Sequence, residues 1–340
     1  MEIINCSDPR WNLYLSKLPP NKQDIYYTSE YHKAYEANGD GTPLLFVFES
    51  QRDLGIYPFM LNKVPDYGFD KEYYDIQSVY GYSGPLLSSN DKEFHKEFEN
   101  AFLDYSHTAR IIAEFIRFHP LQSNTDVFTN GIEVLYDRQT VYLNLQDDLD
   151  IILANQLTSN GRRDIRLAQR KGLATTVSNY PYNFINIYKD TMTQLKADNY
   201  YQFNDSYFTH IASMKSSFII DVHLSNKVIA SAIFFVYGDY CHYHLSGSDK
   251  DYSSYCPNNL LLWEAIKLAK EKKCKTLHFG GGRTSSPDDS LLRFKSNFSK
   301  NRAMYYIGKR ILNDGLYEKL IEQWETKNNK KATILLAYRK

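Results

Sequence analysis

Residues 240–281, YCHYHLSGSDKDYSSYCPNNLLLWEAIKLAKEKKCKTLHFGG, predict a strand, a loop, a helix and a second strand that ends in glycines. We expect the helix to be capped by Asn258 or Asn259, since asparagine is a favoured N-cap residue. A helix start carries unpaired N–H groups and a partial positive charge, and a glycine-rich strand end lets the backbone approach a ligand. This stretch therefore predicts both the fold and the place of a site.

The elements on either side repeat one order twice. In the second half we expect strands over 173–178, 217–224, 228–237, 240–246, 275–279 and 303–308. The helices of that half are expected over 147–157, 159–171, 182–197, 204–214, 258–272 and 315–326, with a short helix before the last strand. In the first half we expect helices over 28–38 and 91–105, and strands over 44–49, 54–62, 73–80, 111–118 and 140–145. This order is similar to that of the N-acetyltransferase (GNAT) fold, and it predicts an α/β (α+β) chain of two tandem GNAT-like domains, with mixed twisted sheets flanked by helices.

The length of 340 residues suits two domains of ordinary size. We place the first domain at 1–150 and the second at 151–315, and we expect a C-terminal helix and tail over 316–340 to pack back on the first. No apolar run approaches the ~18 residues of a membrane span, and the first residues lack a signal-peptide pattern. We therefore expect a cytoplasmic protein with no stable membrane insertion.

The net charge of zero hides an asymmetry between the halves. Residues 1–150 carry 12 basic and 24 acidic side chains, whereas residues 151–340 carry 28 basic and 16 acidic ones. A basic second half favours a phosphate-bearing partner there, and the alternative is attraction between oppositely charged domains. The four cysteines are widely spaced and form no C-x-x-C pair, so we expect no metal site and no disulfide framework.

Three segments of the second half carry residues suited to chemistry. The strand at Tyr243–Asp249 leads to the helix start at Asn258–Leu260, which can hold a phosphate or an oxyanion. The strand at His278–Arg283 ends in three glycines. Lys295 follows Phe294, and partial desolvation would make its amine a fixed positive charge in the site. The plainer alternatives are an ordinary N-cap, a flexible turn and a solvated lysine.

A basic helix precedes these segments. Arg162, Arg166 and Arg170 recur every four residues and form a stripe that suits phosphates or an RNA backbone, unless it is a solvated face or a bridge to the acidic half. Gln169–Ala174 matches the Q-x-x-G-x-A pyrophosphate loop of coenzyme A acetyltransferases, but it closes a helix and opens a strand instead of the reverse. The loop over 246–258, where that motif belongs, lacks it, which weakens coenzyme A as the donor.

In the first half, Tyr80 and Tyr82 alternate with glycine, which is typical of a loop that faces a ligand. Alternation along the strand puts Arg117 and His119 on one face and Glu114 on the other. His119 is a candidate general base, and a structural histidine before proline is the alternative.

These segments together resemble the Fem peptidyltransferase family and its GNAT-like relatives, which build peptidoglycan interpeptide bridges. The matching segments are Tyr80–Pro85, Glu114–Pro120, Arg162–Gly172, Tyr243–Ser248, Pro257–Ala265 and Phe279–Lys295. The resemblance implies a duplicated GNAT fold that moves an aminoacyl or acyl group onto an amine. It implies no cofactor, because the donor is a substrate: aminoacyl-tRNA in the bridge-building enzymes, with a nucleotide-linked or lipid-linked muropeptide as acceptor.

The resemblance also implies roles for single residues. Phe294 and Lys295 resemble the family's Phe-Lys pair, whose lysine matters for catalysis. The first domain would then bind the acceptor, and the second would carry the acyl-transfer site. The expected acceptor-binding residues are Tyr80, Tyr82, Arg117, Arg163 and Arg166. The expected donor-binding residues are Tyr243, Gly247, Asn258, Asn259, Gly281 and Arg283.

Three functions stay open. The first, which we favour, is an aminoacyltransferase that uses charged tRNA and an amine of a peptidoglycan or other cell-surface glycan precursor. The second is an acyltransferase that uses acyl-coenzyme A or an acyl carrier and a (nucleotide-linked) amino sugar. The third is a non-catalytic GNAT-like binding module. The long helical arm of some Fem proteins has no counterpart, since a short link joins the helices expected over 182–197 and 204–214.

Overall fold

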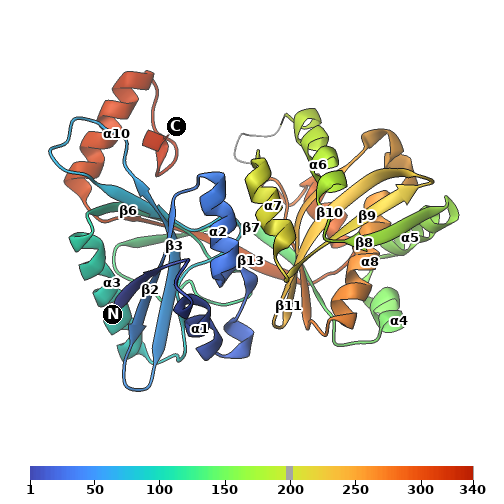
Figure 1. The fold of residues 1–340 in the computed structure, drawn as a ribbon, viewed down its shortest axis with the longest axis horizontal. Helices are drawn as coiled ribbons and strands as arrows, with labels where there is room; N and C mark the ends of the chain where they lie inside the picture. Colours follow the sequence, from blue (N-terminus) through green and yellow to red (C-terminus); the bar gives the residue numbers. More distant parts are fainter. Residues whose placement is uncertain (197–201, 340) are drawn as a thin grey trace. The chain divides into compact units, whose positions relative to one another are not determined.

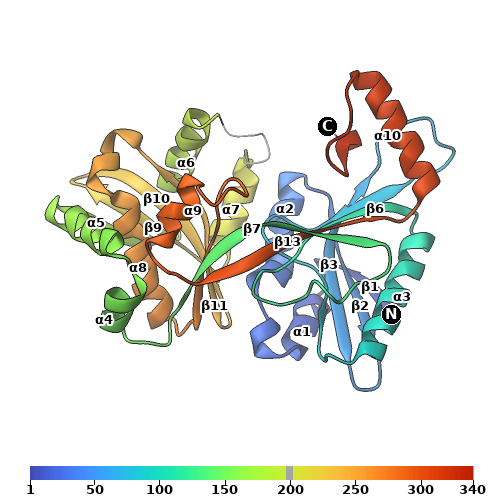
Figure 2. The same cartoon turned by 180° about the vertical axis from the view of Figure 1, so that it is seen from behind.

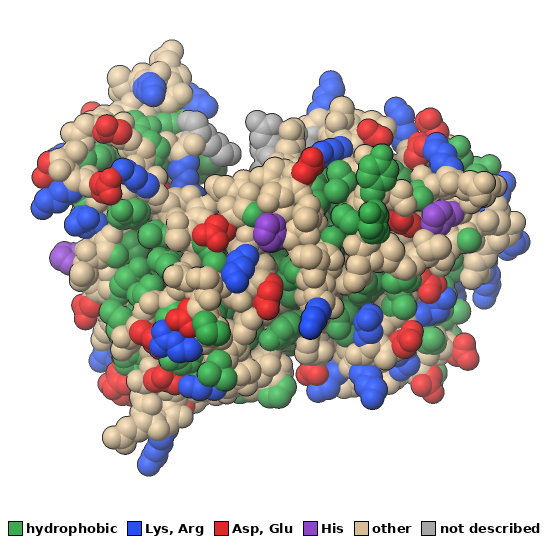
Figure 3. Space-filling model, in the orientation of Figure 1, with side chains coloured by type: hydrophobic (Ala, Val, Ile, Leu, Met, Phe, Trp, Pro, Cys, Tyr) green, Lys and Arg blue, Asp and Glu red, His purple; other side chains and the backbone are tan. Residues whose placement is uncertain are grey.

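The computed structural model of the chain describes residues 1–196 and 202–339, which form two compact units (Figure 1). Unit 1 comprises Met1–Lys22, Tyr26–Asp137 and Tyr305–Lys340, and unit 2 comprises Gln23–Ile25 and Arg138–Met304. In the part of the chain that the structure describes, no helix combines the length and apolarity needed to cross a membrane. Acidic and basic side chains are interspersed on each unit over the face in Figure 3.

Two strands, β7 (Ile132–Asn144) and β13 (Arg302–Ile311), each begin in one unit and end in the other. In unit 2, residues 140–144 of β7 pair with β12, and in unit 1, residues 307–311 of β13 pair with β6. The units therefore divide at 137/138 and 304/305, before the boundaries expected after residues 150 and 315, because the end of β7 pairs within unit 2 and the end of β13 pairs within unit 1.

Unit 1 is a sheet with the strand order β1-β2-β3-β4-β6-β13, antiparallel except for the parallel pair β4 and β6. Its other strands are β1 (Glu2–Asn5), β2 (Thr42–Glu49), β3 (Leu54–Lys63), β4 (Tyr74–Gln77), β5 (Leu86–Leu87) and β6 (Ile111–Arg117). Its helices are α1 (Arg10–Lys17), α2 (Ser29–Asn38), α3 (Lys92–Thr108) and α10 (Asp314–Asn328). The Phe side chains of α3 pack on those of β2 and β3, and α10 packs on β6 with the C-terminal turn Ala337–Arg339.

Unit 2 has the strand order β7-β12-β11-β10-β9-β8, in which β11 and β12 are parallel and the other pairs are antiparallel. Its other strands are β8 (Leu173–Ser178), β9 (Ser217–Leu224), β10 (Lys227–Tyr237), β11 (Tyr240–Ser248) and β12 (Thr276–Gly281). Its helices are α4 (Leu149–Ile151), which continues as a π-helical turn to Gln156, α5 (Ser159–Arg170), α6 (Tyr182–Gln194), α7 (Asp205–Ser213), α8 (Pro257–Glu271) and α9 (Ser290–Ser296) (Figure 2).

The two faces of the unit 2 sheet are covered by different helices. Ala230, Ala232 and Phe234 of β10 share a core cluster with residues of α8, whereas Ser231, which points the other way, lies in a hydrogen-bonded group with Asp221 and Asn183 of α6. Apolar residues along α8 therefore fill one side of the sheet, and α6 covers the other.

Most predicted elements agree in type with the structure. The strand expected over 140–145 is the end of the longer β7, and α1 and β1 were not predicted. The helix expected over 182–197 is α6, and residue 197 lies outside the described residues. The predicted caps of α8 were wrong: the N-cap is Cys256, with a left-handed φ of 55°, and Asn258 and Asn259 lie in the first turn. Pro257 explains the shift, because proline lacks an N–H and favours the first helical position.

A buried ionic cluster ties β13, β6 and α3 together in unit 1. The guanidinium of Arg310, which is 2% exposed, donates from Nε to Glu114 at 2.6 Å and from Nη1 to Glu99 at 3.2 Å. The backbone N–H groups of Thr129 and Asn130 also donate to Glu99. Glu114 is thus buried in the core, and Arg117, three residues further along β6 and partly exposed, points to the opposite face, as alternation predicts.

We expect Arg310→Met to lower the free energy of unfolding of unit 1 by about 3–5 kcal/mol, because it leaves two buried carboxylates without their cation. Urea denaturation followed by the fluorescence of Trp11 and Trp324, in a Trp263→Phe background, would measure this loss. Adding Glu114→Gln should restore part of it, since one buried charge is then removed. A loss below about 1 kcal/mol, as for an exposed pair, would contradict a structural role for the cluster.

Candidate functional site

Strands β11 and β12 diverge halfway along their length. Their parallel pairing covers Tyr240–His242 and Thr276–His278. Beyond it, Gly280 and Gly281 of β12 no longer pair with β11, but they continue the pairing with β7 that runs along β12, after a register shift between His278 and Gly280. On the other side of β11, the register with β10 shifts between Tyr243 and Leu245, which makes His244 a bulge residue. The backbone of the sheet thus parts at Tyr243.

The amine of Lys295 lies where the strands part. The side chain comes from α9 and is 7% exposed, and its Nζ donates to the carbonyl of Gly281 at 2.7 Å. The same Nζ lies 5.6 Å from the ring centroid of Tyr243 on β11. Gly281 and Tyr243 belong to the two diverging strands, so the amine occupies the space between them.

Burial lowers the pKa of Lys295 to about 7. The charge of Asp289 acts against this shift, and the charge of Arg138 adds to it. Near neutral pH the amine is therefore divided between its neutral and charged forms. Such an amine can accept a proton and return it, which the solvated lysine of the alternative interpretation could not do at this pH.

The aromatic neighbours of Lys295 are fixed by packing. Phe294 is half-buried and meets Phe298 edge to face, with ring centroids 5.7 Å apart. The ring of Tyr243 stacks on Phe234 at 5.4 Å, and its hydroxyl donates to Ser246 at 2.5 Å. Burial raises the pKa of Tyr243 to about 12, so its phenol is neutral under ordinary conditions.

The start of α8 is tied to the end of β11. The side-chain amide of Asn258 donates to Ser248 at 3.2 Å, and Asn259 is buried. The N–H groups of Asn259 and Leu260 both donate to the carbonyl of Cys256, at 3.1 and 3.4 Å. These two N–H groups are therefore not the unpaired donors that we expected for an oxyanion.

The glycine at 247 has a packing reason. A Cβ there would lie 2.6 Å from the backbone oxygen of Ile187, because α6 lies directly on β11. Gly281 is the carbonyl partner of Lys295, and the side chain of Arg283 is exposed beside it in the turn after β12.

The arginines of α5 that the sequence analysis singled out lie in two different environments. Arg162 donates from Nη1 to the carbonyls of Leu153, Ala154 and Leu157 and thereby closes the preceding π-helical turn. Arg163 and Arg166 are exposed, and Arg163 pairs with the neighbouring Asp164. Two of the predicted phosphate-binding arginines are thus open to solvent in unit 2.

The other predicted acceptor residues lie in unit 1 and form part of an aromatic group. Tyr82 meets Tyr26 and Tyr305 edge to face, at 5.4 and 5.3 Å, and Tyr80 stacks on Tyr35 at 6.0 Å. Arg117 donates from Nη1 to the carbonyl of Ser78 at 3.0 Å. Tyr80, Tyr82 and Arg117 are all partly exposed.

His119, the candidate base in unit 1, is almost fully buried beside Tyr82, with ring centroids 5.7 Å apart. Its Nδ1 accepts a hydrogen bond from the N–H of Leu121 at 3.2 Å. This contact within a local turn is of the kind expected for a structural histidine before proline.

Two residues beside Lys295 were not predicted. Asp289 is the N-cap of α9 and accepts from the N–H groups of Leu291 and Leu292, both at 2.9 Å. Arg138 of β7 donates to the carbonyls of Gly282 and Arg283. The Asp-Ser-Leu-Leu sequence carries a readable N-cap signal, whereas nothing local marks Arg138.

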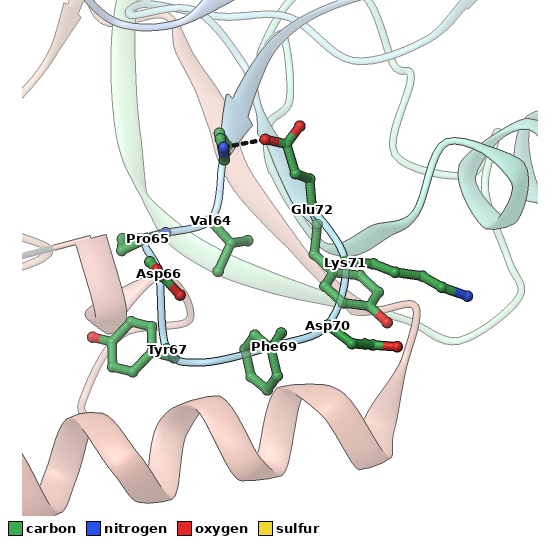
Figure 4. A pocket seen from close by; sticks show the side chains of 10 residues that line it. Val64, Pro65, Asp66, Tyr67, Phe69, Asp70, Lys71 and Glu72 are labelled. Atoms are coloured by element: carbon green, nitrogen blue, oxygen red, sulfur yellow. Dashed lines mark hydrogen bonds and ion pairs between the residues drawn. The ribbon is translucent and has the colours of Figure 1, made fainter.

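A cavity of about 270 Å³ lies elsewhere, inside the loop over 63–73 of unit 1, next to α10 (Figure 4). Lys63 and Glu72, which form an ion pair, and Tyr67 and Phe69 are among the residues that line it. It contains none of the predicted site residues.

Comparison with known proteins bears on the fold. Residues 159–296 match the family model described as an acetyltransferase (GNAT) domain. No curated protein matched the sequence. Among solved structures, the chain is similar to FemX, with a TM-score of 0.72 and 14% identity over 94% of this chain and 99% of that one.

Two further structures share the architecture. One is the C-terminal domain of a putative lysylphosphatidylglycerol synthetase from Agrobacterium fabrum, with a TM-score of 0.55 and 12% identity over 92% of this chain and 93% of that one. The other is a tandem GNAT protein from the clavulanic acid biosynthesis pathway, with a TM-score of 0.51 and 9% identity over 91% and 98%. The predicted fold class and the predicted Fem-like fold are confirmed. Residues 159–296 therefore form a GNAT-type acyltransferase domain within a chain that has the tandem GNAT fold.

Proposed function

We propose that the chain transfers an aminoacyl group from charged tRNA to an amine of a peptidoglycan or other cell-surface glycan precursor. The observation that carries the proposal is the buried amine of Lys295 at the divergence of β11 and β12. The chain shares its fold with FemX and with the domain of a putative lysylphosphatidylglycerol synthetase, and this likeness supports an aminoacyl donor. Tyr80, Tyr82 and Arg117 in unit 1, with Arg163 and Arg166 in unit 2, stay our proposed acceptor-binding residues.

In this reaction the acceptor amine attacks the ester carbonyl of the donor. A carbon–nitrogen bond forms, the carbon–oxygen bond to the tRNA ribose breaks, and one proton moves from the amine to the leaving oxygen. Neutral Lys295 takes the proton from the attacking amine. The resulting ammonium offsets the negative charge on the leaving side and returns the proton to the oxygen. Because the ester is already activated, positioning supplies much of the rate.

A coenzyme A donor is the second candidate, and two observations favour it. The matched family is described as an acetyltransferase domain, and the tandem GNAT protein from clavulanic acid biosynthesis is described with reference to AcCoA. The position of Gln169–Ala174, the segment that matches the pyrophosphate motif, argues against it, because this segment ends α5 and opens β8. Gly172 has a φ of 77°, which is typical of the residue that follows the end of a helix. The 3-10 turn Lys250–Tyr255, which links β11 to α8, does not contain the pyrophosphate motif.

We expect Lys295→Ala to reduce turnover by well over tenfold, because the proton carrier is lost while the helix keeps its cap. The measurement is single-turnover transfer to a nucleotide-linked precursor, with circular dichroism as a check of the fold. The matched control is Lys300→Ala, which removes an exposed lysine nearby and should leave turnover unchanged. Near-normal turnover of Lys295→Ala would remove this residue from the mechanism.

We expect the two donors to be separable by binding. Charged tRNA should bind with an affinity that falls steeply as salt rises, because phosphate contacts release counterions. Coenzyme A should leave the melting temperature unchanged. A clear rise of the melting temperature with coenzyme A, together with weak tRNA binding, would favour the second candidate.

We expect Lys295→Met to stabilise the protein below about pH 7 and to lose this advantage as the pH rises. The pKa of Lys295 falls from 10.5 to about 7 on folding, so the unfolded chain binds more protons between these values. The penalty, on the order of 5 kcal/mol, is complete below pH 7 and vanishes above pH 10.5. Losing the hydrogen bond to Gly281 subtracts about 1 kcal/mol at every pH.

Melting temperatures of both proteins between pH 6 and 10 would measure this trend, with Lys300→Met as control. A difference between Lys295→Met and the unchanged protein that does not vary with pH would show that the amine is not buried in its neutral form.

A further inference from the structure

The end of β12 and the turn that follows it, together residues 280–284, are fixed from two sides. From β7, Arg138 donates through Nη1 to the carbonyl of Gly282 at 2.9 Å and to that of Arg283 at 2.8 Å. From the start of α9, the carboxylate of Asp289 accepts from the N–H groups of Arg283 and Thr284, both at 3.1 Å. The carbonyl of Gly281, which binds Lys295, therefore directly precedes a turn that two charged side chains hold.

The turn packs closely on these two side chains. A Cβ at Gly282 would lie 2.5 Å from the carboxylate of Asp289, and one at Gly281 would lie 3.0 Å from Cδ of Arg138. Glycine is thus required at 282, because any side chain there would displace the carboxylate. The close fit leaves the turn little freedom to move relative to Lys295.

Asp289 acts on both ends of the same contact. One carboxylate oxygen caps α9 through the N–H groups of Leu291 and Leu292, and the other binds the turn. Lys295 comes from α9, and its amine returns to the turn at Gly281. The carboxylate of Asp289 therefore fixes both the helix that carries Lys295 and the turn next to the carbonyl that its amine binds.

Arg138 and Asp289 also bring opposite charges to the amine. Burial acts to raise the pKa of Asp289, but hydrogen bonds from Leu292, Arg283 and Thr284 outweigh it and lower the pKa to about 2. After burial, the carboxylate is the larger influence on the pKa of Lys295, which it raises, while Arg138 lowers it. The phenol of Tyr243 on β11 also faces the amine, and it does not titrate near pH 7.

We propose that Arg138 and Asp289 are positioning residues that hold the Lys295 amine between the parted strands and balance its charge, so that it can accept and release a proton in one turnover. The inference rests on the proposed acyl transfer through Lys295. Neither residue touches the reacting atoms. A scaffold that only had to shape the turn could do so with neutral groups, whereas a pair of opposite charges also sets the protonation of the amine.

The test is the protonation midpoint of Lys295 in the full chain, read from its 13Cε resonance in protein labelled on lysine and assigned by the loss of the signal in Lys295→Met. We expect Arg138→Met to move the midpoint to higher pH, because a neighbouring positive charge is removed. Asp289→Asn, which can still cap the helix through its amide oxygen, should move it to lower pH. The double variant should lie between the two.

Arg302→Met is the matched control. Arg302 also binds two backbone carbonyls, of Ser299 and Asn301, and its Nη2 donates to Ser296 of α9. It should lower the melting temperature without moving the midpoint of Lys295. If Arg138→Met does not fold, Arg138→Lys keeps the charge but not the paired donation, and its midpoint should stay near that of the unchanged protein.

Opposite shifts in the two variants would support the proposal, and shifts in the same direction, or none beyond that of Arg302→Met, would overturn it. The pH dependence of kcat/KM with the proposed substrates is the second readout and should follow the NMR midpoints. If the midpoints shift as expected but no substrate is turned over, the balance of charge stands and the proposed function fails. If turnover occurs with a pH dependence that ignores the midpoints, the role in the reaction is overturned.

Discussion

A buried amine between two parting strands is the constraint on which unit 2 depends. Lys295 is 7% exposed, and its amine binds a carbonyl, which is a weaker partner for an ammonium than a carboxylate. Charge is unfavourable in such a place, and burial brings the pKa of the lysine down to about 7. A side chain needed only to fill this space would be apolar, because it would fill it without that penalty. The arrangement is therefore understandable as one that keeps a proton exchangeable near neutral pH.

The parting of the strands has its own structural causes. The register of β12 against β7 shifts between His278 and Gly280, where the pairing with β11 has ended, and the bulge at His244 interrupts the register of β11 with β10. The bulge is anchored, since the ring of His244 shares a hydrogen bond of 2.7 Å with the hydroxyl of Tyr207 on α7. Burial lowers the pKa of His244 to about 3, so the ring stays neutral and adds no charge beneath the site. The space for Lys295 is thus made by the backbone on both sides.

The sequence was informative where a local pattern determines structure. The order of strands and helices and the α9 segment could be predicted, because periodicity and turn residues act over a few positions. The Phe294–Lys295 pair was singled out by its resemblance to the Phe-Lys pair of the Fem family. The cap of α8 could not be predicted, because Cys256 adopts a left-handed backbone conformation that is uncommon for cysteine. Gly247 was predicted as a ligand contact, and its small size is required by Ile187 of α6, a partner that only the tertiary fold brings near.

The residues around Lys295 divide in the same way. Asp289 stands directly before its helix and could have been found as an N-cap, although its second set of hydrogen bonds, to the turn, could not. Arg138 is far from Lys295 in sequence and reaches it through sheet pairing between β7 and β12. Arg162 looked like its neighbours on the stripe, and its use by three backbone carbonyls depends on the π-helical turn before α5.

Arg310 and Lys295, which are both buried, show why their residue types differ. Arg310 in unit 1 is surrounded by Glu99 and Glu114, and a guanidinium cannot lose its proton in a protein, so burial without carboxylates would be very unfavourable. Lys295 in unit 2 has no carboxylate within ion-pair distance among residues 1–196 and 202–339, and it responds to burial by giving up its proton. Arginine therefore suits the place that only has to be held together, and lysine suits a buried place whose cation can give up its proton. An arginine at position 295 would leave a permanent charge between β11 and β12. A lysine at position 310 would place a single amine in the core of unit 1, where it could not bind both carboxylates as well as the planar guanidinium does.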